Sequence, residues 1–308
     1  MIILQARDLA KSFGPVAAVN GLDLDVEEGT IAGLIGPDGA GKSTLLRLFI
    51  GLLRPTSGSV TIAGLNVATQ SAKIKDIIGY MPQHFSLYGD LTVAENLKFF
   101  ADLYGVGKAA FIRRREELLH FSALGPFQDR LARQLSGGMQ KKLALACNLF
   151  HTPKILFLDE PTTGVDPVSR RELWELLGQI NKDSVTIIMT TPYMDEAARC
   201  RKVGLMFEGR ILAYDAPAAV IAAMTDEIAE LAAPIAPALK ALRDGPGVKS
   251  VHPFGDTIHI VLQGTGDLDA IARRLAERGV AVHGLKKIAP SFEDAFLALS
   301  QKRESWRT

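Results

Sequence analysis

One short stretch of the sequence limits the possible folds more than any other. Residues 36–44 read Gly-Pro-Asp-Gly-Ala-Gly-Lys-Ser-Thr and satisfy the phosphate-loop pattern G-x-x-x-x-G-K-[ST] at every required position. The apolar run Thr30–Ile35 before it suits a buried parallel strand, and leucines at helical spacing follow it. This order of strand, loop and helix is the context in which the pattern binds phosphate, although an unrelated glycine loop can match it by chance. The stretch predicts a nucleotide phosphate site on a parallel sheet.

The positions of this loop have different expected roles. Its glycines let successive N–H groups, and the start of the following helix, point at phosphate oxygens. Lys42 is expected to neutralise the β- and γ-phosphates, and Ser43 to place its hydroxyl on Mg²⁺. The residues predicted to contact the nucleotide here are Gly36, Pro37, Asp38, Gly39, Ala40, Gly41, Lys42, Ser43 and Thr44.

Composition places the chain among ordinary folded proteins. At 308 residues it is longer than one typical domain, so we expect a main domain and a smaller second one. The hydrophobic fraction of 47% is enough for a real core, and 35 Lys and Arg nearly balance 34 Asp and Glu, for a net charge of +1. Because no overall positive charge attracts a polyanion, we expect no nucleic-acid partner.

No stretch of the chain is typical of a membrane or secretion segment. Residues 1–8 are too short and too soon charged for a secretion signal, and no apolar run approaches the ~20 residues of a membrane span. A function at a membrane would therefore need another chain to supply the spans. The two cysteines, Cys147 and Cys200, indicate buried thiols in a reducing compartment, and the six histidines lack metal-ligand spacing.

A second glycine motif lies at residues 135–140, which read Leu-Ser-Gly-Gly-Met-Gln and open another expected helix. A Ser-Gly-Gly sequence before a helix leaves N–H groups free beside the positive end of the helix dipole, which is a second anion-binding geometry. The same residues also suit an ordinary helix N-cap. The motif alone does not separate the two interpretations.

Two adjacent acids follow the apolar run Ile155–Leu158, the pattern of a buried strand that delivers carboxylates to a site at its carboxyl end. Adjacent side chains on a strand point to opposite sides, so the two acids are expected to have different roles. Asp159 suits Mg²⁺ bound through water, and Glu160 suits polarising an attacking water. A capping role for Asp159 is the alternative, which the phosphate loop upstream disfavours.

Aromatic residues occur at two further places. Phe13 lies in an expected turn between strands at 2–9 and 19–26, where a ring more often fills a core than stacks on a base. Residues 85–104 are helical and aromatic in pattern, which indicates either a groove for a partner helix or a small helical core.

The C-terminal residues change period several times. Strands are expected at 227–231, 248–254, 257–262 and 280–288, helices at 236–243 and 268–279, and a last helix at 291–300. The order β-α-β-β-α-β is that of a ferredoxin-like α+β unit. We expect it to serve dimer contact or regulation, with inert packing as the alternative.

Taken together, the motifs resemble those of the ATP-binding subunits of ATP-binding cassette (ABC) transporters. The resemblance covers roughly the first seven-tenths of the chain. Several of its segments are also similar in sequence to drug- and antibiotic-export ATPases and to the first cassette of YbhF-type two-cassette export ATPases. It implies a P-loop NTPase cassette at 1–224, with a RecA-like parallel core, an antiparallel edge sheet and a helical subdomain at about 84–150, followed by the accessory domain at 225–308. The motifs that carry the resemblance are the phosphate loop, Gln83 after a strand, the residues 135–140, the pair Asp159-Glu160, and Gly164-Val165-Asp166-Pro167.

In this family two cassettes form a head-to-tail dimer that holds ATP and Mg²⁺ between the phosphate loop of one and the Ser-Gly-Gly of the other. The resemblance implies an ATPase at the cytoplasmic face of the cell membrane, bound to a multi-span permease that it powers for export. The alternatives are a soluble cassette ATPase outside transport and a nucleotide-dependent regulatory module without turnover. The implied roles are Phe13 on adenine, Gln83 on Mg²⁺ and the membrane partner, Ser136, Gly137 and Gly138 on the nucleotide of the partner cassette, Asp166 between the two sites, and Glu160 as catalytic base.

One position departs from the family pattern. Where the family usually has histidine, this chain reads Thr191-Pro192-Tyr193, and proline has neither a side-chain donor nor a backbone N–H. The contact that this histidine makes to the γ-phosphate is therefore absent, and the loss of one such donor costs on the order of a hundredfold in rate. We therefore expect an impaired site with weak hydrolysis, and a heterodimer with a more complete cassette in preference to a homodimer.

Overall fold

The computed structural model describes residues 1–84, 87–243, 245–264 and 267–304. Contacts between residues divide the chain into two compact units, Met1–Pro217 and Ala218–Thr308. The short helix α7 (Pro217–Ala222) begins at this division, and the predicted domain boundary at 224/225 lies just beyond it. That boundary stays a prediction, and the two units are described one at a time.

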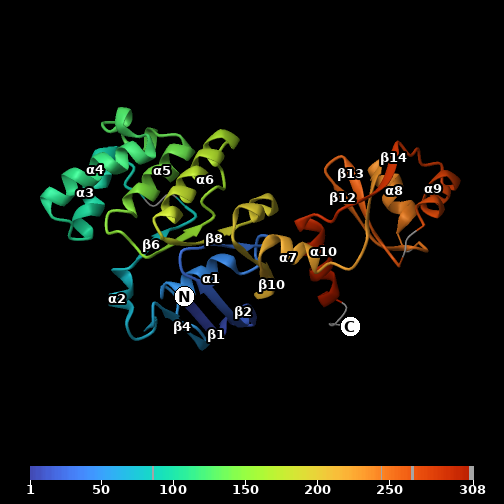
Figure 1. The fold of residues 1–308 in the computed structure, drawn as a ribbon, viewed down its shortest axis with the longest axis horizontal. Helices are drawn as coiled ribbons and strands as arrows, with labels where there is room; N and C mark the ends of the chain where they lie inside the picture. Colours follow the sequence, from blue (N-terminus) through green and yellow to red (C-terminus); the bar gives the residue numbers. More distant parts are fainter. Residues whose placement is uncertain (85–86, 244, 265–266, 305–308) are drawn as a thin grey trace. The chain divides into compact units, whose positions relative to one another are not determined.

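A six-stranded sheet forms the centre of the first unit, in the order β10-β9-β3-β8-β7-β6 (Figure 1). Neighbouring strands are parallel except β10, which runs antiparallel to β9. Every residue of β3, β7 and β8 is buried, because both faces of the sheet are covered. The strands are β3 (Ile31–Ile35), β6 (Ile78–Met81), β7 (Ile155–Asp159), β8 (Thr186–Thr191), β9 (Lys202–Phe207) and β10 (Arg210–Asp215).

An antiparallel sheet, β2-β1-β4-β5, shares its core with the central sheet. Helix α1 (Lys42–Phe49) contacts β2 and β4 on one side and β7 and β8 on the other, and Phe49 meets Phe157 at a ring-centre distance of 6.5 Å. The predicted first two strands are confirmed but longer, so that Phe13 ends β1 instead of lying in the turn. The strands are β1 (Ile2–Phe13), β2 (Val16–Glu27), β4 (Ser57–Ile62) and β5 (Leu65–Asn66).

Helices gather beyond the central sheet, where α3 and α4 pack against α5 (Figure 1). Thr92 and Glu95 form a reciprocal capping box that fixes the start of α3. Residues 85 and 86, which begin the helical and aromatic stretch expected at 85–104, lie outside the described part of the chain. The helices of this unit are α2 (Ser71–Lys75), α3 (Val93–Leu103), α4 (Lys108–Ser122), α5 (Gly137–Cys147), α6 (Pro167–Lys182) and the 3₁₀ turns η1 (Gly125–Phe127), η2 (Ala132–Gln134) and η3 (Met194–Arg199).

The second unit has the predicted ferredoxin-like arrangement. Its four strands pair antiparallel throughout in the order β12-β13-β11-β14, which is the spatial order of that fold. The last strand is shorter than the predicted 280–288 and begins at Gly284. The elements are β11 (Ile228–Ala232), α8 (Ile235–Leu242), β12 (Val248–Phe254), β13 (Thr257–Leu262), α9 (Leu268–Glu277), β14 (Gly284–Ile288) and α10 (Phe292–Glu304).

The two faces of this second sheet are covered differently. Helices α8 and α9 pack over one face in a core that includes Leu231 and Ile260. On the other face, His259 of β13 is bonded to Asp294 of α10 at 2.8 Å between Nδ1 and Oδ1. Alternation along β13 explains this, since neighbouring residues 259 and 260 point to opposite faces.

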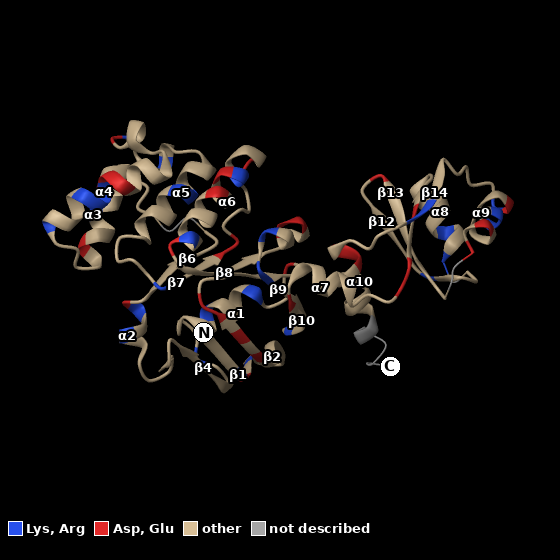
Figure 2. Ribbon diagram, in the orientation of Figure 1, with Lys and Arg blue, Asp and Glu red and all other residues tan. Residues whose placement is uncertain are grey.

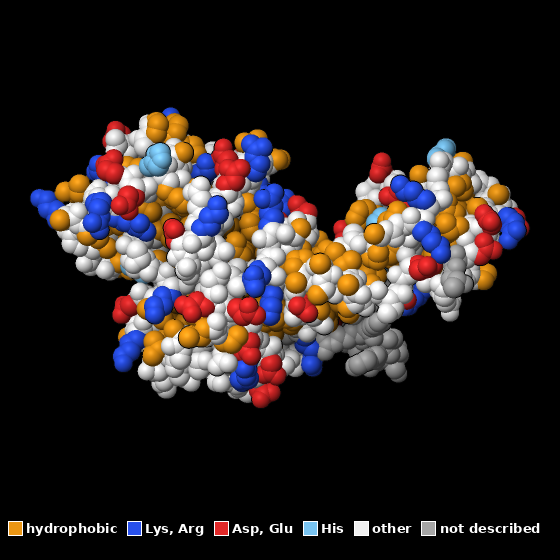
Figure 3. All heavy atoms as spheres, in the orientation of Figure 1, with side chains coloured by type: hydrophobic (Ala, Val, Ile, Leu, Met, Phe, Trp, Pro, Cys, Tyr) orange, Lys and Arg blue, Asp and Glu red, His pale blue; other side chains and the backbone are white. Residues whose placement is uncertain are grey.

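Neither sign of charge dominates the elements of the two units. Lys, Arg, Asp and Glu are interspersed along the elements of each unit (Figure 2), and both signs lie side by side on the face in Figure 3.

No helix in the described part of the chain has the length and apolar character needed to cross a bilayer. The expectation of no nucleic-acid partner stays a prediction.

Candidate active site

The phosphate loop lies between β3 and α1, where only glycine fits at several positions. Gly39 and Gly41 have φ values of +81° and +99°, and a Cβ on Gly41 would lie 2.2 Å from the carbonyl oxygen of Ala18. No side chain caps the start of α1, so its first N–H groups are available to a ligand. A cavity of about 350 Å³ opens here, lined by Ala18, Asp38, Gly39, Ala40, Gly41, Lys42, Ser43, Thr44, Gln83 and Glu160.

Lys42 is buried at the floor of this cavity. Its ammonium donates to the carbonyl oxygens of Gly36 at 2.8 Å and Pro37 at 3.0 Å. It also lies 3.6 Å from Oε1 of Glu160, and both side chains are almost fully buried. Such a charge is costly to bury without partners, and in this structure the loop carbonyls and Glu160 supply them.

Asp159 offers the chemistry of a magnesium site. Its Oδ1 accepts from the hydroxyls of Ser43 at 2.8 Å and Thr190 at 2.7 Å, and the residue is completely buried. Its Oδ2 has no hydrogen-bond partner within the described residues. A buried, unpaired carboxylate oxygen beside a serine hydroxyl fits Mg²⁺, which takes one or two protein oxygens and keeps several waters.

Glu160 is held from several sides. Its Oε2 accepts from Nε2 of Gln83 at 2.8 Å and from the hydroxyl of Thr163 at 3.2 Å. Its backbone N–H donates to Oγ1 of Thr190 at 2.9 Å, in a left-handed conformation with φ of +49°. Backbone strain of this kind in a non-glycine residue concentrates at functional sites. The carboxylates of the two adjacent acids thus have different hydrogen-bond partners.

Three polar residues at this site escaped the sequence analysis. Thr190 joins both acids, Thr163 bonds Glu160, and Lys141 donates to the carbonyl oxygen of Gln83 at 3.0 Å. For Thr190 a signal existed, since two threonines follow the apolar residues 187–189 at the end of β8. Thr163 lies only three residues after Glu160, which was a signal, whereas nothing in the sequence linked Lys141 to the site because only the fold brings it there.

A buried carboxylate stabilises the segment that follows the acids. Glu196 accepts from Nε of Arg170 at 2.7 Å, from Nε1 of Trp174 at 3.0 Å and from the hydroxyl of Thr162 at 3.1 Å. With only 1% of its surface exposed, Glu196 needs all of these donors. The network connects residues 162, 170 and 196, so it fixes both the segment after β7 and the one after β8.

The second glycine motif forms the start of α5, away from the phosphate-loop cavity. Ser136 caps the helix by accepting from the N–H of Met139 at 3.3 Å, so the N-cap interpretation applies, while Gly137 beside it is exposed. A Cβ on Gly138 would lie 2.5 Å from the side chain of Ser169, so this glycine is required for packing on α6. The structure of one chain does not bring these residues to the phosphate loop.

Further predicted residues also lie outside the cavity lining, namely Phe13, Gly36, Pro37, Asp159 and Asp166. Phe13 is 49% exposed, with the Lys11 ammonium 5.1 Å from its ring centre. Asp166 caps α6, and its hydrogen bonds from Ser169 and Val168 hold its pKa below the usual range. Pro192 directly follows β8 and carries no donor, as the sequence analysis expects.

Comparison with known proteins gives concordant results. The family model described as "ABC transporter" matches residues 19–163. The chain is 42% identical over 285 residues to a probable multidrug ABC transporter ATP-binding protein, YbhF of Escherichia coli, covering 92% of this chain but 49% of YbhF, so it spans about half of that relative. It is 34% identical to the daunorubicin resistance ATP-binding protein DrrA2 of Streptomyces coeruleorubidus, covering 97% of this chain and 95% of DrrA2.

A solved structure supports the fold of the first unit. The dimeric, post-hydrolysis structure of the ATP-binding cassette MJ0796, bound to ADP and Pi, superimposes with a TM-score of 0.64 at 26% identity. The match covers 70% of this chain and 98% of that one.

Proposed function

Since the chain belongs to the family of ABC transporter ATP-binding proteins, we propose that it is the ATP-hydrolysing subunit of an exporter of the drug, antibiotic or lipid class. The observation that carries the proposal is the cavity of about 350 Å³ that joins the phosphate loop to Gln83 and Glu160. The unpaired Oδ2 of Asp159 lies at the end of the adjacent strand β7. Together these residues supply the phosphate-binding, Mg²⁺-binding and water-polarising groups that ATP hydrolysis needs.

The residues present divide the work of hydrolysis. The N–H groups at the start of α1 and the Lys42 ammonium bind and neutralise the phosphates. Ser43 and Asp159 would hold Mg²⁺, which neutralises charge on the phosphate oxygens when bound. Glu160 accepts the proton of the attacking water, and its bonds from Gln83 and Thr163 orient the carboxylate for that task.

A second cassette completes the site in this proposal. Ser136 and Gly137 are exposed at the start of α5, away from the chain's own phosphate loop, and Gly138 follows them, which suits a role on a partner's nucleotide. The dimeric MJ0796 structure with bound ADP and Pi supports this arrangement. Pro192 leaves the chain's own site one donor short, so we favour a heterodimer with a more complete cassette.

A multi-span permease is the proposed membrane partner. The rings of Tyr88 and Phe99 pack edge to face at 4.5 Å, yet the two residues remain 51% and 37% exposed, and Leu103 is 64% exposed. These side chains therefore do not close into a core of their own, which supports the partner-helix interpretation. The chain would then work as a peripheral subunit at the cytoplasmic face of the membrane.

The test compares the ATPase rate of the full chain with those of Glu160→Gln and Pro192→His. We expect slow turnover in the wild type, turnover near background in Glu160→Gln, and a rate about a hundredfold higher in Pro192→His. Wild-type turnover that is already fast and unchanged by Pro192→His would contradict the impaired-site proposal. A wild type no faster than Glu160→Gln would instead indicate the regulatory module without turnover.

The alternative of a cassette ATPase outside transport has its own test. We expect the chain to extract from membranes together with a multi-span protein, and to lose that association when Phe99→Ser and Leu103→Ser are combined. A chain that fractionates with ribosomes or DNA instead would favour the alternative.

A further inference from the structure

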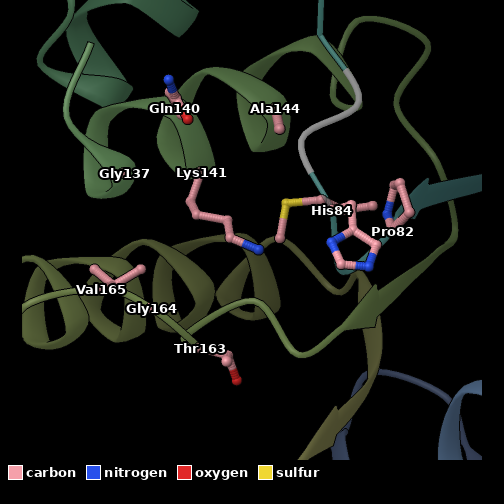
Figure 4. A pocket seen from close by; sticks show the side chains of 10 residues that line it. Pro82, His84, Gly137, Gln140, Lys141, Ala144, Thr163, Gly164 and Val165 are labelled. Carbon is pink, nitrogen blue, oxygen red and sulfur yellow. The ribbon is translucent and has the colours of Figure 1, made fainter. Parts of the chain in front are cut away.

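A small cavity lies beside the active site, on the other side of Gln83. Its volume is about 190 Å³, and Figure 4 shows the Lys141 side chain extending from α5 toward the end of β6. The residues that line it come from the end of β6, the start of α5 and the segment after β7: Met81, Pro82, His84, Gly137, Gln140, Lys141, Ala144, Thr163, Gly164 and Val165.

Lys141 connects the main chains of two catalytic residues. Its ammonium donates to the carbonyl oxygen of Gln83 at 3.0 Å and makes a longer contact of 3.5 Å with that of Glu160. The side chains of the same two residues are themselves bonded at 2.8 Å. The ammonium therefore closes a ring of contacts that sets how Gln83 and Glu160 face each other.

Burial and the nearby carboxylates act on this ammonium in opposite directions. Burial lowers the pKa of Lys141, while the nearby carboxylates of Glu160 and Asp159 oppose that shift. A neutral side chain of similar length would lose both carbonyl contacts and leave the two oxygens without this donor. The following residue, Lys142, is different, since its ammonium pairs with Glu172 at 2.6 Å and contacts no catalytic residue that we identify.

Helix α5 also carries the second glycine motif at its start. Lys141 follows Gly137 and Gly138 by about one helical turn on the same helix. Gly138 is packed so closely on Ser169 that the helix start and the beginning of α6 must move together. A shift of α5 is thus transmitted to Lys141, and from there to Gln83 and Glu160.

We propose that Lys141 is a positioning residue that ties the start of α5 to the chain's own catalytic carboxylate. The inference rests on the proposed function, in which the start of α5 serves the nucleotide of a partner cassette. Occupancy of the partner's site then alters the geometry of Glu160 through one lysine, so the two composite sites of a dimer are coupled within each chain.

The test compares Lys141→Met, Lys141→Arg and the matched control Lys142→Met, each in the wild-type and Pro192→His full chain. We expect Lys141→Met to lower kcat about tenfold with less than about a twofold change in KM for ATP, because positioning acts on the chemical step. Arginine should restore at least about half of the rate, and Lys142→Met should change kcat by less than about twofold. A KM effect without a kcat effect, equal losses in both Met variants, or no rescue by arginine would overturn the proposal.

A measurement that needs no turnover separates this inference from the proposed function. We expect amide hydrogen exchange to quicken at residues 81–84 and 159–164 in Lys141→Met and to stay unchanged there in Lys142→Met. Unchanged exchange at both segments in Lys141→Met would refute the positioning role. Absence of turnover in every variant, with the exchange difference present, would instead count against the proposed function alone.

Discussion

The two units of this chain bury polar groups in opposite ways. In the first unit Asp159 is fully buried with one oxygen bonded twice and the other left without a partner among the described residues. In the second unit both oxygens of the buried Asp294 are used, Oδ1 by His259 and Oδ2 by the N–H and hydroxyl of Ser291. The difference teaches that burial alone does not identify a site. A buried carboxylate with an unpaired oxygen, beside residues that line a cavity, is the stronger indication of a site.

Removing the buried ammonium of Lys42 in the first unit should have the largest effect of the changes considered. Lys42→Ala is expected to weaken ATP binding about a hundredfold, because the buried ammonium is the main positive charge facing the phosphates. Equilibrium titration with a fluorescent ATP analogue measures it, with Lys98→Ala on the exposed face of α3 as control. Equal affinity in the wild type and Lys42→Ala would mean that the cavity is not the phosphate site.

Breaking the closed pair of the second unit should affect stability and spare catalysis. Asp294→Ala leaves His259 buried without its partner, at a cost of about 2 kcal/mol in the free energy of unfolding of that unit. The adjacent exposed Glu293→Ala is the matched control and should change it little. Denaturant unfolding measures the difference. A large loss of ATPase activity in Asp294→Ala, with unfolding unchanged, would show that the pair is functional and not structural.

The smallest expected effect is a pH dependence of the second unit. Burial lowers the pKa of His252 from its ordinary 6.5, an effect that His259 reinforces and Asp294 opposes. Below that ordinary value the unfolded chain binds more protons than the folded one, so stability should fall as pH falls through about 6. His252→Gln should flatten this decline between pH 7 and 5 in thermal unfolding scans. An unchanged decline in His252→Gln would assign the dependence to other groups.

Short contiguous patterns explain why so much of the cassette could be predicted. The phosphate loop, the strand β7 that ends at Asp159 just before Glu160, and the start of α5 each depend on neighbouring residues, and the sequence shows such patterns directly. The β-α-β-β-α-β order of the second unit could be predicted because each of its elements also follows from the pattern of neighbouring residues. Its topology then follows from the few ways in which such a unit can pair its strands.

Contacts between residues far apart in the chain could not be predicted from the sequence. Lys141 and Thr190 reach the acids only because β8 pairs with β7 and α5 packs nearby, which no local pattern encodes. The bond from Asp294 in the first turn of α10 to His259 on the sheet is likewise long-range, and no local pattern predicts it. The Phe13 turn was misplaced because the register of β1 and β2 extends to the pair Phe13 and Val16.

The most direct test of the account is the affinity of a non-hydrolysable ATP analogue, measured in excess Mg²⁺ and in excess EDTA. The unpaired oxygen of Asp159 predicts that Mg²⁺ strengthens binding to the full chain by about tenfold or more, and that Asp159→Asn loses most of this gain. Equal affinities with and without Mg²⁺ in the wild type would contradict the assignment of the cassette's buried carboxylate as an open ligand site.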